Sequence, residues 1–162
     1  MVSQCSRKLY VFIDKSNNVF SLIAVEESEL TKVASRIAWV RHFKTLRKRE
    51  KKGFLKAFPR RAQRVHYLLV YVRIFTRLNK LEHFLHSISK GIKVLCIDDE
   101  VLRYLESRGF RSEKYNIRVV LESKTRHKVG LRRLMLFTDD LANYARLMLS
   151  KGRYKDLEKL VK

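Results

Sequence analysis

The chain has 162 residues, of which 46% are hydrophobic, so it can bury a real core and is not a disordered basic tail. Its 37 lysines and arginines outnumber 16 aspartates and glutamates, which gives a net charge of +21 at pH 7. Like charges on a compact surface repel one another, and a bound polyanion relieves that repulsion. The composition therefore predicts a nucleic acid as partner, with an anionic membrane surface as the alternative.

The first predicted elements form a β-hairpin. Residues 8–14 (KLYVFID) are rich in β-forming side chains and end at an acid. Ser-Asn-Asn at 16–18 is typical of a turn, and residues 19–25 resume as a second strand. Two strands joined by so short a turn run antiparallel.

Two long helices are expected next. Acidic residues at 26–29 favour a helix start, and apolar residues at helical spacing extend this helix to about Lys52, where Gly53 ends it. Pro59 can open a second helix at its first turn. A four-three apolar stripe continues this helix and would pack in the core or against a partner helix, which permits a homodimer: Tyr67, Tyr71, Ile74, Leu78, Leu81, Leu85 and Ile88. A competing interpretation makes residues 65–75 a strand, because they are dense in aromatic and β-branched side chains; we favour the helix.

The second half of the chain alternates strands and helices. Residues 92–97 are a continuous apolar run that predicts a buried strand, and a short helix follows at 100–107. Residues 116–121 predict another strand, and 131–149 a long helix. The charged residues 151–162 form a terminal helix or tail.

This order, β-β-α-α-β-α-β-α, predicts an α/β fold with a mixed sheet covered by helices. The opening hairpin is antiparallel, and the later alternation implies parallel pairing. We expect residues 1–150 to form a single domain, because neither a linker nor an internal repeat divides them.

Acidic residues are few, and several follow directly on predicted strands. Asp14, Asp98, Asp99 and Glu122 close strands, and Asp139 and Asp140 lie in the last long helix. Carboxyl ends of parallel strands converge in open α/β sheets, and such a cluster can hold two magnesium ions about 4 Å apart that promote phosphodiester cleavage. The alternatives are structural: Asp98 or Asp99 as a helix cap, Asp14 bonded to its own turn, and Asp139 or Asp140 paired with surface cations.

Three segments that cover about half the chain are YVFIDKSNNVFSLIAV, IKVLCIDDE and VVLESKTRHKVGLRRLMLFTDDLANYARLML. They resemble an uncharacterised ribonuclease-H-like family that begins with an Asp-Glu-Ser-Gly motif, and the last segment resembles the family's closing strand and its Leu-Gln-x-Ala-Asp helix. The resemblance implies a ribonuclease-H-like fold with Asp14, Asp98 and Asp139 or Asp140 as metal-binding, catalytic residues. Lys15 and Asn17 stand where the first motif has Glu and Gly, and a lysine there can compete with a metal for Asp14.

Basic residues are concentrated in two segments. The first segment contains eleven of them against one acid, Glu50: Arg41, Lys44, Arg47, Lys48, Arg49, Lys51, Lys52, Lys56, Arg60, Arg61 and Arg64. Phe54 and Phe58 lie within it and either stack on unpaired bases or pack in the core. The second segment precedes and opens the last long helix, whose dipole favours phosphate: Lys124, Arg126, His127, Lys128, Arg132 and Arg133.

The expected function is binding of nucleic acid, RNA rather than DNA, through phosphates and without sequence specificity, as a ribonucleoprotein or ribosome-associated component. Such binding requires no cofactor; the alternative, a ribonuclease-H-like nuclease, requires Mg²⁺. Cys5 and Cys96 stand far apart, which predicts reduced thiols, and the apolar run 9–13 is too short for a signal peptide. We therefore expect a cytoplasmic protein, and its two glutamines and single proline fit a thermophile.

Overall fold

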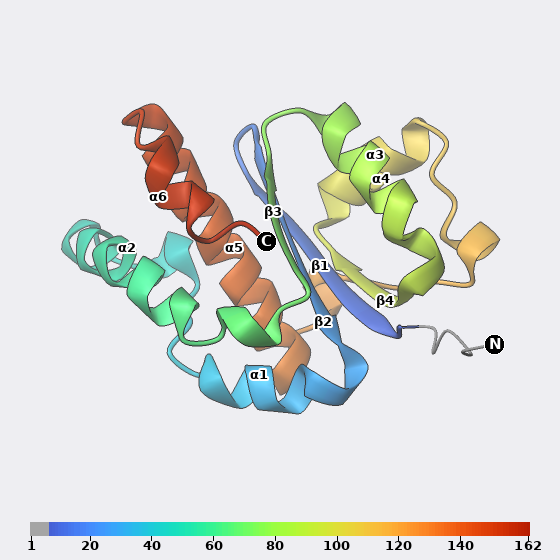
Figure 1. The fold of residues 1–162 in the computed structure, drawn as a ribbon, viewed down its shortest axis with the longest axis horizontal. Helices are drawn as coiled ribbons and strands as arrows, with labels where there is room; N and C mark the ends of the chain where they lie inside the picture. The colour runs from blue at the N-terminus through green and yellow to red at the C-terminus, as the bar shows by residue number, and fades with distance from the viewer. Residues whose placement is uncertain (1–6) are drawn as a thin grey trace.

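The structure is a computed structural model that describes residues 7–162, and within them five strands form one mixed sheet in the order β3-β2-β1-β4-β5 (Figure 1). Their bounds are β1 Leu9–Ser16, β2 Val19–Glu26, β3 Tyr71–Phe75, β4 Ile92–Ile97 and β5 Arg118–Leu121. Strand β2 runs antiparallel to β1 and β3, whereas β1, β4 and β5 are parallel. The predicted α/β class with a mixed sheet is confirmed.

The opening hairpin is also confirmed. Strands β1 and β2 pair from Leu9 opposite Glu26 to Ser16 opposite Val19. The turn requires a left-handed residue, and Asn17 supplies it with φ 54, a conformation that asparagine tolerates better than most residues.

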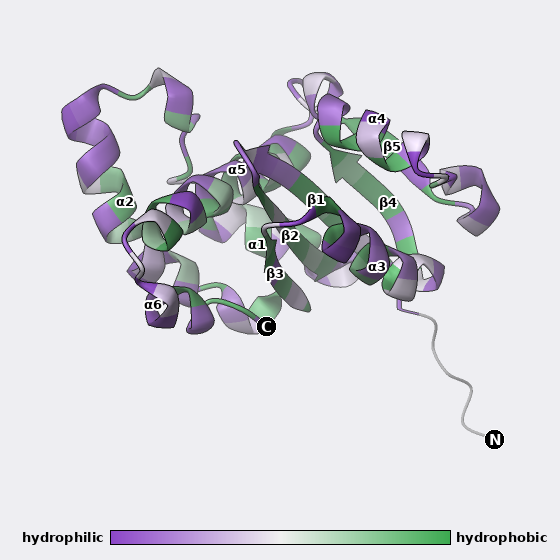
Figure 2. Ribbon diagram, turned by 90° about the horizontal axis from the view of Figure 1, so that it is seen from above, coloured by the Kyte–Doolittle hydropathy of each residue, from purple (hydrophilic) through white to green (hydrophobic). Residues whose placement is uncertain are grey.

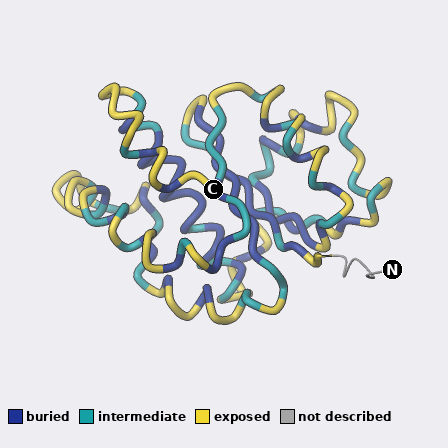
Figure 3. The backbone as a smooth tube through the Cα atoms, in the orientation of Figure 1, coloured by how far each residue is buried: buried dark blue, intermediate teal, exposed yellow. Residues whose placement is uncertain are grey.

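Helices cover both faces of the sheet (Figures 1 and 3). The α-helices of the described chain are α1 Leu30–Arg36, α2 Lys48–Gln63, α3 Leu78–Ile88, α4 Asp99–Ser107, α5 Val129–Ser150 and α6 Tyr154–Glu158. Helices α1, α2, α5 and α6 share one core with Phe12 and Ile23, and helices α3 and α4 share another with Val11 and Ile13. Because successive side chains of a strand point to opposite faces, β1 and β2 are buried on both sides. Hydrophobic colour accordingly fills the strands, while the outer part of α2 is hydrophilic (Figure 2).

The single helix predicted as far as Lys52 is wrong. Helix α1 ends at Arg36, an irregular segment follows, and α2 begins at Lys48 and runs through both Gly53 and Pro59. Packing explains the difference, because Leu55, Phe58 and Ala62 of α2 are buried in the core, which outweighs the local preference of glycine and proline to end a helix.

The favoured helical interpretation of residues 65–75 is wrong, and the competing strand is correct only for Tyr71–Phe75, because His66–Leu68 form a short 3-10 helix before it. Strand β3 lies at the edge of the sheet beside β2, and Val72 also exchanges two backbone hydrogen bonds with Lys162, of 3.0 and 2.8 Å. Helical spacing holds only from Leu78 onward, where Leu81 and Leu85 are fully buried against the sheet. Residues 67–88 therefore do not form the continuous helical stripe that suggested a homodimer.

The later elements lie close to their predicted positions. The short helix before Gly109 is present, and Gly109 adopts φ 101, which favours glycine. Strand β5 begins at Arg118, two residues later than predicted, because Asn116 is left-handed with φ 58. In the terminal segment α6 is a single short helix.

Two other expectations concern cysteines and membranes. Cys96 is buried with a free thiol, and Cys5 lies outside the described residues. None of the helices between residues 7 and 162 combines the length and apolarity that crossing a bilayer requires.

Candidate metal centre

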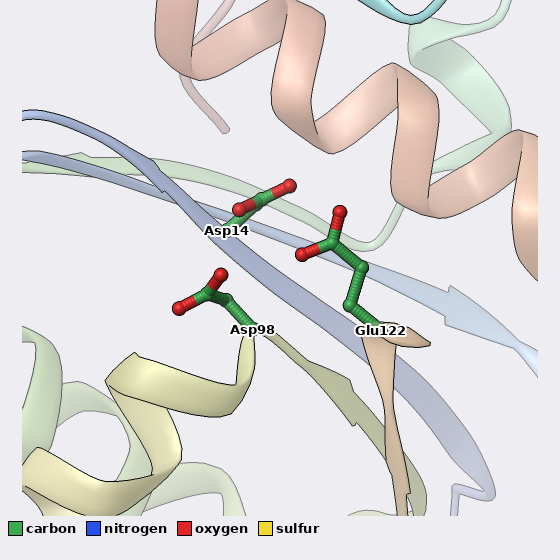
Figure 4. A group of neighbouring side chains, drawn as sticks. All are labelled: Asp14, Asp98 and Glu122. Carbon is green, nitrogen blue, oxygen red and sulfur yellow. The ribbon is translucent and has the colours of Figure 1, made fainter. Parts of the chain in front are cut away.

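Three carboxylates meet at one edge of the sheet. Asp14 lies near the end of β1, Asp98 directly follows β4, and Glu122 directly follows β5. Because these strands are parallel neighbours, their carboxyl ends lie at the same edge, and the backbone N–H of Asp98 continues the pairing by donating to Ile13 at 3.0 Å. One oxygen from each carboxylate lies within 4.8 Å of the others, and Figure 4 shows the side chains pointing toward one another.

Asp14 is the most deeply buried member of this carboxylate cluster. Its side chain faces α5, like that of Ser21 opposite it on β2, whose hydroxyl donates to the Thr138 carbonyl at 2.7 Å. Asp14 is 3% exposed; Oδ1 accepts a hydrogen bond from the Lys15 N–H at 2.8 Å, but Oδ2 has no partner among residues 7–162. Burial, followed by the charge of Glu122, raises the pKa of Asp14 well above its usual range. A buried carboxylate with an unpaired oxygen is costly unless it takes up a proton or a bound cation compensates its charge.

Asp98 has a structural role as well. Its Oδ1 accepts hydrogen bonds from the backbone N–H groups of Glu100 and Val101, both at 3.0 Å, so it is the N-cap of α4. The capping interpretation is thus confirmed for Asp98. Capping occupies a single carboxylate oxygen, so it is compatible with membership of the cluster.

Glu122 completes the cluster from β5. It is half-buried, and burial, followed by the charge of Asp98, raises its pKa to about 7. Arg132 of α5 opposes this shift by favouring the ionised form. An acid in a pocket whose pKa is raised by burial and by a neighbouring acid is a candidate functional residue.

Of the remaining predicted acids, one lines the same pocket as the cluster and two do not. Asp139 of α5 is 7% exposed and lies in the same pocket; Oδ1 accepts from Asn143 Nδ2 at 3.2 Å, and burial raises its pKa. Asp140 is fully buried behind it and does not line the pocket; burial, followed by the charge of Asp139, raises its pKa to about 9. Asp99 accepts a hydrogen bond from the Ser123 hydroxyl at 3.2 Å, outside the cluster. Surface pairing of Asp139 and Asp140 was the alternative, and their burial contradicts it.

The three clustered acids and Asp139 line a pocket of about 480 Å³ that also contains residues which sequence reasoning missed. Arg146 Nε donates to Ser16 Oγ at 2.7 Å, and Ser16 Oγ donates to Asn143 Oδ1 at 2.8 Å. Since Asn143 also contacts Asp139, this chain of hydrogen bonds connects the β1–β2 turn to the acid on α5. The signal in the sequence was the spacing of Asp139, Asn143 and Arg146, four and three residues apart on one helix face.

Lys15 does not compete for the carboxylate beside it. Its Nζ forms an ion pair of 2.7 Å with Glu100 Oε2 and lies 5.6 Å from the centre of the Tyr104 ring. The hydrogen bond to Glu100 raises the pKa of Lys15, so it stays charged at the rim of the pocket. The departure at Lys15 from the resembled motif therefore leaves Asp14 available.

Most predicted cations of the first basic segment are exposed: Arg41, Lys44, Arg47, Lys48, Arg49, Lys52, Lys56, Arg60 and Arg64. Lys51 and Arg61 are half-buried and lie over the rings of Phe43 and Trp39, at 5.2 and 5.5 Å from the ring centres. Lys44 and Lys51 reach the acidic pocket. This segment therefore runs from an exposed basic surface to the carboxylates.

Base stacking by Phe58 is contradicted. Phe58 is fully buried, with ring centres of Phe137 and Tyr144 at 5.6 and 5.4 Å, so it belongs to the core. Phe54 is half-buried and packs against the core, with its ring centre 6.1 Å from that of Trp39.

The second basic segment is only partly exposed. Lys124, Arg126 and Lys128 are exposed, Arg132 is half-buried near Glu122, and Arg133 donates to the Ala34 carbonyl at 3.2 Å. Arg133 thus connects α5 to α1. Only the exposed cations of this second basic segment can contact a ligand.

The chemistry of the pocket is the guide to function. No protein-family model matches the chain, and a search of curated proteins finds none of significant similarity. Three carboxylates at the carboxyl ends of neighbouring parallel strands, with Asp139 and several lysines in the same pocket, favour a site for a divalent cation and a phosphate-bearing substrate.

Proposed function

We propose that the protein is a divalent-metal-dependent nuclease with a ribonuclease-H-like fold. One observation carries the proposal: Asp14, Asp98 and Glu122 bring carboxylate oxygens within 4.8 Å of one another, with an oxygen of Asp14 buried and unpaired within the described chain. Carboxylate oxygens grouped in this way are the hard ligands that a small divalent cation prefers.

The topology of the sheet supports the fold part of this proposal. Ribonuclease-H-like proteins place five strands in the order 3-2-1-4-5 with only the second strand antiparallel, and this sheet has the same order and directions. The resemblance in the sequence implied Asp14, Asp98 and Asp139 or Asp140 as ligands. The pocket favours Asp139 over Asp140 and adds Glu122.

The residues present fit magnesium. Asp14, Asp98, Glu122 and Asp139 offer hard oxygen donors, and two of these side chains have a buried oxygen without a partner in residues 7–162, namely Asp14 Oδ2 and Asp139 Oδ2. Bound there, magnesium would polarise a phosphoryl oxygen and make an adjacent water a better nucleophile.

The chain's own residues would bind and orient the substrate. Lys15, Lys44 and Lys51 at the pocket can contact phosphates on either side of the scissile bond. Arg146, through Ser16 and Asn143, holds Asp139 in a fixed orientation. Preorganised charge of this kind favours a transition state without reorganisation during the reaction.

Cleavage assays test the proposal. Labelled RNA, DNA and RNA–DNA duplexes are incubated with the purified protein in Mg²⁺ or in excess chelator. Fragments that appear only with the metal support a nuclease. Intact substrate under both conditions, together with tight binding, favours the second candidate, a nucleic-acid-binding protein without catalysis. The exposed cations of the first basic segment are the observation behind that candidate.

Both candidates predict that α2 contributes to binding through phosphates. Reversing the charge of Lys48, Arg49 and Lys52 to Glu, all exposed, is expected to raise the Kd for RNAs of unrelated sequence about equally, by about tenfold or more. Affinity should also fall less steeply with salt, because fewer counterions are released. Fluorescence anisotropy across a salt series measures both effects.

A matched control separates position from total charge. Lys151, Lys155 and Lys159 are also exposed, so reversing them changes the net charge by the same amount away from α2. Equal losses in the two triple variants would show that total charge, rather than the surface of α2, determines affinity. A loss confined to one RNA sequence would contradict binding through phosphates and indicate base readout.

A further inference from the structure

A second cavity lies on the face of the sheet that α3 and α4 cover. Its volume is about 570 Å³, larger than the acidic pocket, and none of its lining residues is shared with that pocket. It is bounded by the outer side of α3 and by the segment that connects α4 to β5. The size is within the range of roughly 300–1,000 Å³ that is typical of small-ligand sites.

The cavity is basic. Its only acid, Glu82, is paired with Arg108, whose Nε lies 2.7 Å from Glu82 Oε2. The other cations, Lys80, Arg111 and Lys114, are exposed and have no ion pair with any acid in the described part of the chain. Three uncompensated cations around one cavity favour an anionic ligand.

The backbone holds one of these cations in place. Arg111 Nη1 donates to the carbonyls of Glu106 and Phe110, both at 2.8 Å, which fixes the guanidinium at the cavity. The segment that carries Arg111 and Lys114 lies between two left-handed residues, Gly109 with φ 101 and Asn116 with φ 58. A fixed guanidinium loses little conformational freedom when it binds phosphate.

Aromatic side chains form the apolar part of the lining. The Tyr115 hydroxyl is 2.7 Å from His86 Nδ1, and the two rings meet edge to face with centres 5.6 Å apart. Phe110 lies beside them in the lining, packed against the core under α3 and α4. Such surfaces pack well against a base or a sugar.

We propose that this cavity binds one nucleotide unit, with its phosphate on Lys80, Arg111 and Lys114 and its base or sugar against Phe110 and Tyr115. The inference deepens the proposed function, because that nucleotide would belong to the strand that the protein binds. A free mononucleotide offers the same phosphate and base and is the other source. The site is separate from the carboxylate cluster, so it concerns binding and not cleavage.

The double variant Lys80→Glu, Lys114→Glu tests the inference, with Lys151→Glu, Lys155→Glu as a control of equal charge change at exposed positions outside this cavity. Binding of a labelled single-stranded oligonucleotide is measured in chelator, which prevents cleavage, and binding of AMP is measured by calorimetry. We expect the Kd for the strand to rise by about tenfold or more in the cavity variant, equivalent to about 1.4 kcal/mol, and to change much less in the control. The milder Lys80→Gln, Lys114→Gln should weaken binding in the same direction, and thermal melting confirms that each variant folds.

The outcomes separate this inference from the nuclease proposal. Saturable AMP binding that the cavity variant loses identifies a mononucleotide site, whereas weakened binding of the strand alone identifies a strand contact. Equal Kd values for the cavity and control variants, or no binding of either probe by the unaltered protein, overturn the inference. A protein that neither cleaves nor binds magnesium but shows the cavity effect refutes the nuclease and leaves this site in place.

Discussion

Replacing Asp14 with asparagine is expected to abolish magnesium-dependent cleavage, lowering the rate by about 10³-fold or more. The substitution keeps the shape of the side chain but removes the charge at the most buried member of the cluster. Loss of metal-assisted stabilisation costs several kcal/mol of transition-state energy, and about 4 kcal/mol corresponds to a factor of 10³. The measurement is initial cleavage rate at saturating Mg²⁺, and binding of the nucleic acid in chelator should change little.

Asp99→Asn is the matched control. Asp99 adjoins Asp98 in the chain but lies outside the cluster, where its contact is the Ser123 hydroxyl. Its variant should cleave at nearly the rate of the unaltered protein. Cleavage that survives Asp14→Asn, or that Asp99→Asn reduces equally, would contradict the assignment of the site.

The second large effect concerns stability and pH. Burial raises the pKa of Glu122 to about 7 and that of Asp140 to about 9, so above about pH 4 the folded protein holds protons that the unfolded chain releases. Without divalent metal, the free energy of unfolding is therefore expected to fall as pH rises from about 5 to about 9. Denaturant unfolding at several pH values in chelator measures this slope.

Asp140→Asn should reduce that dependence on pH. Asparagine cannot ionise, and one unit of pKa difference is worth about 1.4 kcal/mol, so we expect a stabilisation of about 2 kcal/mol or more near pH 8 and much less near pH 5. Asp140 does not line the pocket, so cleavage should persist. A difference in stability between Asp140→Asn and the unaltered protein that is the same at pH 5 and pH 8 would contradict the raised pKa of Asp140.

Local sequence patterns were enough to predict those helices and strands whose apolar residues fit only one kind of secondary structure. The hairpin, β4 and α5 each combine a continuous or regularly spaced apolar run with a clear turn or acid at one end. The cluster of Asp14, Asp98 and Glu122 was predictable for a related reason. Parallel strands end at the same edge, so the acids at their carboxyl ends lie close together.

The errors arise where packing between distant residues decides the structure. Residues 71–75 fit both a helical stripe and a strand, and their pairing with β2 determines the outcome. Gly53 and Pro59 normally interrupt helices, but buried Leu55 and Phe58 keep α2 continuous. The contact of Arg146 with Ser16 joins residues 130 positions apart, so no local pattern could reveal it.

Calorimetric titration of Mn²⁺ or Mg²⁺ into the purified protein tests the central claim most directly, namely that Asp14, Asp98 and Glu122 hold a divalent cation. Saturable binding is predicted near pH 8 for the unaltered protein and for Asp99→Asn, weakening toward pH 5 as Asp14 and Glu122, whose pKa values are raised, take up protons, and absent from Asp14→Asn. The claim would be contradicted if the titration detected no binding at millimolar metal, or if Asp14→Asn bound the metal as tightly as the unaltered protein.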